Sequence, residues 1–115
     1  MNYKNTLSII LLISFILANC QNNNTKNKVM NNQEKQIIID VRSEEEWQFD
    51  GHADCSVNYP LDIFESKIDE LKKFDRIILV CRSGNRAGIA KRQLMNAGYT
   101  NEIENLGAWQ NVSCN

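Results

Sequence analysis

The sequence contains little proline, glycine or histidine, and its charges nearly balance. One proline and five glycines among 115 residues exclude a collagen-like chain and a Gly/Pro-rich low-complexity chain. A formal net charge of −1 gives no reason to expect nucleic acid as a partner. The single histidine has no cluster of other ligand residues around it, and no Cys-x-x-Cys occurs. We therefore predict no metal, no cofactor and no thioredoxin-like redox role.

The charges and the asparagines are distributed unevenly along the chain. Residues 1–33 carry three lysines and no acidic residue, whereas residues 34–115 carry 10 basic and 14 acidic side chains. Asparagine fills seven of the 14 positions from 19 to 32. The chain therefore divides into an apolar N-terminus, an Asn/Lys-rich spacer and an acidic body, and its length fits a single domain.

The N-terminus has the pattern of a targeting segment. A mostly apolar run of 12 residues, Leu7–Ala18, fits the core of a secretory signal. It is too short for an ordinary transmembrane helix, which needs about 20 apolar residues. The sequence Leu17-Ala18-Asn19-Cys20 resembles the lipobox of bacterial lipoproteins. This resemblance implies a signal peptide at residues 1–19 and lipidation of Cys20, with an ordinary secretory signal, an uncleaved signal or a buried core helix as alternatives.

The spacer, residues 20–33, has only Val29 and Met30 as large apolar side chains. Such a segment buries too little surface to offset the entropy lost on ordering, so we predict a disordered tether. With a lipidated Cys20, it would hold residues 34–115 at the extracytoplasmic, periplasmic side of a bacterial cell envelope. The chain would then contact the membrane only through its lipid anchor.

The body alternates between strand-like and helix-like segments. Continuous apolar runs are typical of strands buried on both faces of a parallel sheet. Helical spacing and capping signals separate these runs. Strands joined through helices predict an α/β fold with a central, mostly parallel sheet flanked by helices. The expected strands are 37–41, 57–59, 76–80 and 102–106, the expected helices 43–50, 61–71 and 87–97, and the expected turn 107–109.

A polar loop with a cysteine follows the strand predicted at 76–80. It reads Cys81-Arg82-Ser83-Gly84-Asn85-Arg86. Free N–H groups at the start of the next helix, the helix dipole and two arginines favour an anion in this loop. Such surroundings lower the pKa of a thiol and yield a nucleophilic thiolate, while Gly84 lets the backbone curl without a Cβ clash. The alternative is a small buried cysteine that only packs.

Four further motifs accompany this loop. They are Asp40-Val41-Arg42 with Glu46-Trp47, Gly51-His52, Asn58-Tyr59-Pro60-Leu61, and Leu106-Gly107-Ala108-Trp109. With the Cys-x-x-Gly-x-Arg pattern of the loop, their order and spacing resemble those of a single-domain rhodanese, a thiosulfate sulfurtransferase-like module. The resemblance covers residues 37 to about 112. Ala53-Asp54-Cys55 and Ala108 depart from the family pattern.

The resemblance implies a small rhodanese-like domain over residues 34–115 and two-step covalent catalysis. The Cys81 thiolate would take the outer sulfur of a small anionic donor such as thiosulfate and pass it to a thiol, a protein or cyanide. The N–H groups of residues 82–86 would cradle the resulting persulfide. Arg86 would orient the loop, and Arg82 would meet the donor. The protein is expected to be a monomer.

Two other functions use similar residues. Cysteine-dependent phosphatases and arsenate reductases have Cys-x5-Arg loops, whereas Cys81 and Arg86 are separated by four residues, which suits a single sulfur atom better. A sulfur-carrier or binding module without turnover is the other alternative. Silent members of such families usually lack the cysteine, and Cys81 is present.

Five other residues receive structural interpretations. Asp40 and Arg42 are expected to pair at the end of a strand and support the loop, unless they form only a surface ion pair. His52 is expected to make a structural hydrogen bond. Trp47 and Trp109 are expected to lie in the core rather than to stack on a substrate.

Three cysteines remain once Cys20 is assigned to the lipid. One hypothesis is a Cys55–Cys114 disulfide that leaves Cys81 free. In the other, Cys55 approaches Cys81 and resolves its persulfide or sulfenate. Cys114 is the penultimate residue and could also be frayed.

Overall fold

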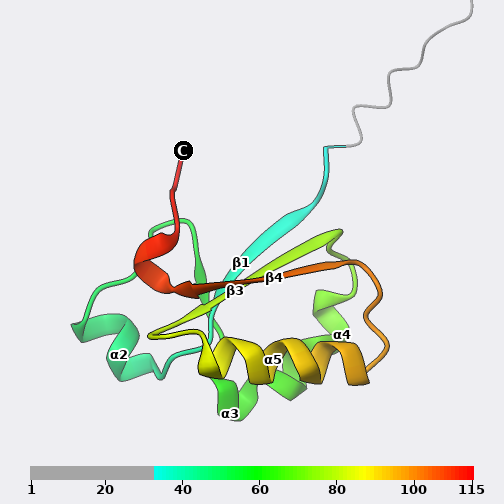
Figure 1. The fold of residues 1–115 in the computed structure, drawn as a ribbon, viewed down its shortest axis with the longest axis horizontal. Helices are drawn as coiled ribbons and strands as arrows, with labels where there is room; N and C mark the ends of the chain where they lie inside the picture. The colour runs from blue at the N-terminus through cyan, green and yellow to red at the C-terminus, as the bar shows by residue number, and fades with distance from the viewer. Residues whose placement is uncertain (1–32) are drawn as a thin grey trace, which may run out of the picture. The chain divides into compact units, whose positions relative to one another are not determined.

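The computed structural model describes residues 33–115, which form a parallel sheet with helices connecting its strands (Figure 1). The predicted signal peptide, the lipidation site at Cys20 and nearly all of the predicted tether lie outside the described residues. Within the described part, no helix is long and apolar enough to cross a membrane. The elements are β1 (Gln36–Asp40), α2 (Glu44–Phe49), β2 (Val57–Asn58), α3 (Leu61–Phe64), η2 (Glu65–Lys67), α4 (Ile68–Leu71), β3 (Arg76–Cys81), α5 (Asn85–Asn96), β4 (Glu102–Ala108) and η3 (Trp109–Asn111).

The four strands run parallel in the order β2-β1-β3-β4. β3 lies in the interior of the sheet between β1 and β4, and its last five residues are all buried, as expected for a strand covered on both faces. Parallel neighbours require crossover connections, which the helices supply. The predicted α/β fold with a parallel sheet is therefore confirmed.

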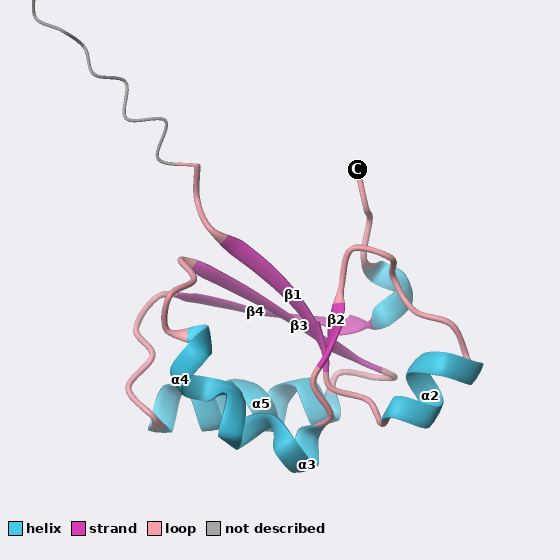
Figure 2. Ribbon diagram, turned by 180° about the vertical axis from the view of Figure 1, so that it is seen from behind, coloured by secondary structure: helices cyan, strands magenta, loops and turns pink. Residues whose placement is uncertain are grey.

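One face of the sheet packs against α3, α4 and α5 (Figure 2). Alternate residues of β3 point to this face, because successive side chains of a strand point to opposite sides. Small side chains on the inner side of α5 allow the helix to approach the sheet closely. The core cluster consists of Ile39, Val41, Phe64, Ile68, Leu71, Ile77, Leu79, Cys81, Ala87, Ala90, Leu94 and Tyr99.

α2 begins with the predicted capping box. The Ser43 hydroxyl accepts a hydrogen bond from the Glu46 backbone N–H at 3.2 Å, and the Glu46 carboxylate accepts one from the Ser43 N–H at 3.0 Å. The helix ends at Phe49, and Gly51 follows with a φ of +89°, a conformation that favours glycine. The capping signals in the sequence thus place this short helix correctly.

The structure corrects two predicted segments. The helix expected over 61–71 is interrupted by η2, where the Ile68 N–H bonds the Glu65 carbonyl in a tighter i→i−3 pattern. The turn expected at 107–109 begins later, since Gly107 and Ala108 still pair with Val80 and Cys81 in the sheet. Gly107 instead takes a φ of +82° at a register shift between β3 and β4, a use of glycine typical of a bulge.

Candidate active site

Cys81 stands where β3 ends and the chain turns into α5. It is buried, and it is the one free cysteine among residues 33–115. The Gly84 backbone N–H donates a hydrogen bond to the Cys81 Sγ at 2.9 Å. Because the carboxyl ends of parallel strands are the usual ligand-binding edge of such sheets, this thiol lies where chemistry is expected.

The surroundings of Cys81 favour the thiolate. Burial raises the pKa of the thiol, but backbone N–H groups of Ala87, Ser83, Gly84 and Arg86 lower it by more. The net pKa of Cys81 therefore lies below its ordinary value. These N–H groups belong to the loop and to the first turn of α5. N–H groups at a helix start have no partners within the helix, so they are free to bind the sulfur. The loop thus stabilises a negative charge on sulfur without a neighbouring histidine.

Asn105 of β4 fixes the shape of this loop. Its side-chain amide donates to the Gly84 carbonyl at 2.9 Å, and its carbonyl oxygen accepts from the Gly107 N–H at 3.0 Å. Gly84 has a φ of +96°, and a Cβ there would lie 3.4 Å from the Gly107 Cα. The loop therefore favours glycine at position 84 because of this backbone conformation, which L side chains rarely adopt, whereas a Cβ there would only contact β4.

Arg86 binds Glu46 of α2. Its two terminal nitrogens donate to the carboxylate at 2.6 and 2.9 Å. The hydrogen bond from Arg86 holds the pKa of Glu46 down at about 2, and Glu46 in turn raises the pKa of Arg86. Arg86 therefore links the loop to α2, and its role in orienting the loop stays a prediction.

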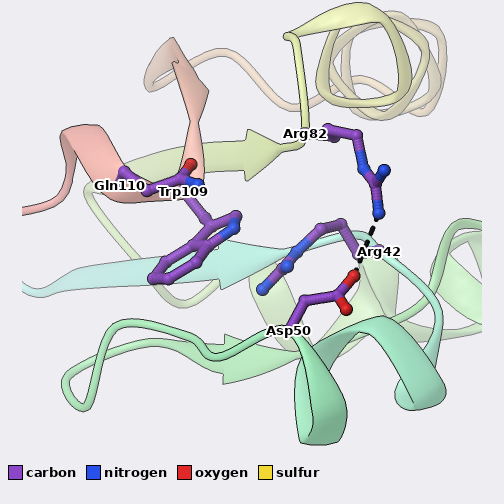
Figure 3. A pocket seen from close by; sticks show the side chains of 5 residues that line it. All are labelled: Arg42, Asp50, Arg82, Trp109 and Gln110. Atoms are coloured by element: carbon purple, nitrogen blue, oxygen red, sulfur yellow. Dashed lines mark hydrogen bonds and ion pairs between the residues drawn. The ribbon is translucent and has the colours of Figure 1, made fainter.

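Arg82 reaches across the mouth of the site to the same helix. Its Nη2 lies 3.0 Å from an Asp50 oxygen and 3.3 Å from a Glu46 oxygen (Figure 3). The sequence indicates positive charge at the two loop arginines. The fold adds carboxylate partners for both of them, Glu46 of α2 and Asp50 at its end.

Asp40 and Arg42 form a buried pair beside the loop. Their side chains are 0% and 1% exposed, and Arg42 makes a two-pronged contact with the carboxylate, with distances of 2.7 to 3.0 Å. Arg42 also donates to the Gly51 carbonyl at 2.7 Å. The Asn58 amide binds the carbonyls of both Asp40 and Arg42. The pair is therefore a structural brace for the strand end, and a surface ion pair is excluded.

A hollow of about 310 Å³ opens next to this brace. Figure 3 shows its lining, with the Trp109 ring on one side and Asp50 and Arg82 on the other. The Arg42 guanidinium lies 4.9 Å from the centre of the Trp109 ring. Trp109 is thus a wall of a cavity beside the loop, which corrects its assignment to the core. The lining residues are Arg42, Asp50, Arg82, Trp109 and Gln110.

His52 has the structural role expected of it. Its Nδ1 lies 2.8 Å from the Trp47 carbonyl oxygen, and its ring stacks on the Trp47 ring at 3.7 Å between centroids. Because a carbonyl can only accept, Nδ1 carries the proton. Among residues 33–115, no group of three His, Cys, Asp or Glu side chains is placed to hold a metal ion.

Cys55 and Cys114 form a disulfide across 59 residues of sequence. The first of the two cysteine hypotheses is confirmed, and Cys55 is not available to resolve Cys81 while this bond is intact. The disulfide ties the C-terminal tail to the turn that follows Gly51 and His52. It therefore also anchors the segment that carries Trp109.

Sequence reasoning left four contributors out of the site. Asn105, Asp50 and Gln110 were not singled out, and Glu46 appeared only in the capping signal of the helix and in a family motif. Asn105 gave one usable signal, a polar residue near the carboxyl end of a predicted strand next to the loop. The other three depend on how α2 and η3 pack beside the loop, which no local pattern specifies.

Comparison with known proteins agrees with this geometry. The family model described as "Rhodanese-like domain" matches residues 23–113. A rhodanese domain-containing protein of Drosophila melanogaster, CG4456, is 36% identical over 85 residues, which cover 63% of this chain and 77% of that protein. The thiosulfate sulfurtransferase PspE of Escherichia coli is 32% identical over 77 residues, or 65% and 72% of the two chains.

A solved structure described as a rhodanese with anions from E. coli superimposes with a TM-score of 0.60 and 30% identity. The superposition covers 70% of this chain and 94% of that one. The same fold, the cysteine loop and the matched family model agree. The chain belongs to the rhodanese-like domain family, whose relatives include sulfurtransferases.

Proposed function

We propose that this protein is a sulfurtransferase that carries sulfane sulfur as a persulfide on Cys81. The observation that carries the proposal is the set of backbone N–H groups directed at the Cys81 sulfur, including that of Gly84 at 2.9 Å. Such a set lowers the thiol pKa before reaction and can hold the negative charge of the terminal sulfur afterwards. Membership in a family with sulfurtransferase relatives supports the same activity.

The reaction has two displacement steps. The Cys81 thiolate attacks the outer sulfur of a donor such as thiosulfate, the donor S–S bond breaks, and sulfite leaves with the bonding electrons. An acceptor thiolate or cyanide then attacks the outer sulfur of the persulfide, and Cys81 leaves as the thiolate. No net oxidation of the protein occurs, so no cofactor is required for balance.

We also propose that the domain works outside the cytoplasm, attached through a lipid on Cys20. The Cys55–Cys114 disulfide supports an oxidising compartment, because such bonds are rare in the cytosol. Membrane fractions should contain the wild-type chain labelled with a fatty acid, whereas Cys20→Ser should lose the label. Equal labelling of both would contradict the anchor.

Mass spectrometry of the purified protein tests the main proposal. After incubation with thiosulfate, the wild-type protein should gain one sulfur atom, located on the peptide that contains Cys81. Added cyanide should remove this atom and release thiocyanate. Cys81→Ser should gain nothing, whereas a Cys55→Ser/Cys114→Ser double variant should still be loaded. Loading that survives Cys81→Ser would contradict the mechanism.

The two alternatives give different results in the same preparation. A carrier without turnover would load one sulfur atom per chain and release no thiocyanate beyond the first equivalent. A phosphatase-like enzyme would hydrolyse a phenyl phosphate and gain no sulfur from thiosulfate. Continuous thiocyanate formation that depends on Cys81 distinguishes the proposed enzyme from both.

A further inference from the structure

The side chain of Arg82 lines the hollow beside the loop. Its guanidinium meets Asp50 at 3.0 Å, with Glu46 second at 3.3 Å (Figure 3). Asp50 and Arg82 both line the hollow, together with Trp109. Arg82 follows Cys81 directly in the chain and lines this hollow, so a sulfur donor that approached Cys81 through the hollow would pass this ion pair.

Each of the three arginines around the loop has a carboxylate as its main partner. Arg42 is bound by Asp40, Arg86 by Glu46, and Arg82 chiefly by Asp50. These three pairs are charge-balanced. The anion-stabilising power of the site therefore comes from the loop N–H groups at the sulfur rather than from free cationic side chains.

The three carboxylates differ in their burial and in the other contacts that they make. Asp40 is fully buried and braces the strand end, and Glu46 caps α2 while it holds Arg86. The Asp50 side chain is 49% exposed, and Arg82 is its ion-pair partner at the hollow. Changing Asp50 therefore alters the charge at the entrance without removing a brace of the fold.

We propose that Asp50 is a specificity-determining residue for the sulfur donor. By pairing with Arg82, it keeps the entrance free of excess positive charge and so disfavours doubly charged donors relative to donors of lower charge. The inference rests on the proposed sulfurtransferase function and adds a residue that sets the preference of that site. Asp50 touches neither the sulfur nor the loop amides, so it acts through Arg82.

Two donors that transfer the same outer sulfur but differ in net charge test the effect of donor charge by itself. Thiosulfate carries two negative charges, whereas methanethiosulfonate carries one, and each presents a terminal sulfur to the Cys81 thiolate. The S–S bond breaks in both cases, and sulfite or methanesulfinate leaves with the bonding electrons. A change in charge at the entrance should act about twice as strongly on the binding free energy of the dianion.

The experiment measures KM for both donors with cyanide as acceptor. Asp50→Asn should free Arg82 and lower KM for thiosulfate by about three- to tenfold, and KM for methanethiosulfonate by about two- to threefold. The ratio of KM for thiosulfate to KM for methanethiosulfonate should therefore fall. Added salt should reduce the difference in this ratio between Asp50→Asn and the wild type. The matched control is Glu45→Gln, the same loss of charge on the exposed side of α2, which should leave the ratio unchanged.

A second comparison tests whether Asp50 acts through Arg82. In an Arg82→Gln background, Asp50→Asn should change the ratio less than it does in the wild type. An unchanged ratio in Asp50→Asn, or an equal change in both backgrounds, would overturn this inference while wild-type Cys81 still loads sulfur. Failure of wild-type Cys81 to load sulfur from either donor would overturn the proposed function, and this inference with it.

Discussion

Glu46 and Arg86 join α2 to the first turn of α5 through two hydrogen bonds, at 2.6 and 2.9 Å. The same Glu46 carboxylate accepts from the Ser43 N–H and so closes the cap of α2. A six-residue helix has little stability of its own. The Glu46 carboxylate therefore links the loop that holds Cys81 to the short helix that ends just before Asp50.

Glu46→Gln should lower the free energy of unfolding by about 1 to 2 kcal/mol at neutral pH, because the charge-assisted bonds to Arg86 are lost. The folded pKa of Glu46 is lowered from 4.5 to about 2, so its contribution is complete above the unfolded pKa and disappears as pH falls through the folded one. Urea titrations at pH 7 and about pH 2.5 should show the difference from wild type shrinking at the lower pH. A difference that does not depend on pH would contradict this role.

Asp40→Asn should destabilise the protein by about 3 to 5 kcal/mol, because it leaves the charge of Arg42 buried without compensation. The control is Asp69→Asn, which breaks an exposed pair with Lys72. That change should cost less than about 1 kcal/mol. Thermal unfolding followed by circular dichroism measures both, and equal effects would show that the buried pair is no more important than the surface pair.

Gly84→Ala and Gly98→Ala separate backbone strain from damage to the site. Both glycines have a positive φ, so alanine should destabilise the protein by about 1 to 2 kcal/mol at either position. The Gly84 N–H bonds the Cys81 sulfur and a Cβ at position 84 would contact Gly107, whereas position 98 has open space around it. Only Gly84→Ala should slow the loading of sulfur on Cys81, and comparable slowing in both variants would count against the loop geometry.

The Cys81 thiol should react as an anion at a lower pH than an ordinary cysteine. The N–H groups of the loop outweigh the effect of burial and lower its pKa. The rate of alkylation by iodoacetamide, measured against pH, should therefore reach half its maximum at a lower pH in the folded protein than in urea. A folded midpoint at or above the unfolded one would show that burial dominates.

Loss of the Cys55–Cys114 disulfide should lower the free energy of unfolding by about 2 to 4 kcal/mol, because the bond closes a long loop of the unfolded chain. The double variant Cys55→Ser/Cys114→Ser measures this effect without exposing Cys81 to a reductant. Its unfolding should not respond to added dithiothreitol, whereas that of the wild type should. Equal stability of the two proteins would indicate that the tail contributes nothing to the fold.

Local patterns were sufficient to predict the elements and the reactive loop. The apolar runs that contain Ile39 and Leu79 mark buried strands, because only a strand covered on both faces tolerates so many consecutive large apolar side chains. Ser43 and Glu46 mark the start of α2, because the capping box is a contact between near neighbours. Cys81 and Gly84 stand out for the same reason, since the turn and the helix start that surround the thiol are adjacent in sequence.

Only the tertiary structure decided the electrostatics of the site. The sequence by itself determined that Arg82 and Arg86 flank the thiol, but their partners Glu46 and Asp50 lie 40 and 32 residues away. Packing of α2 against the start of α5 brings these charges together, and the pairing converts an apparent positive patch into balanced ion pairs. Ion pairing acts through distance in space, which is why the spacing of residues along the chain predicted the nucleophile but not the charge around it.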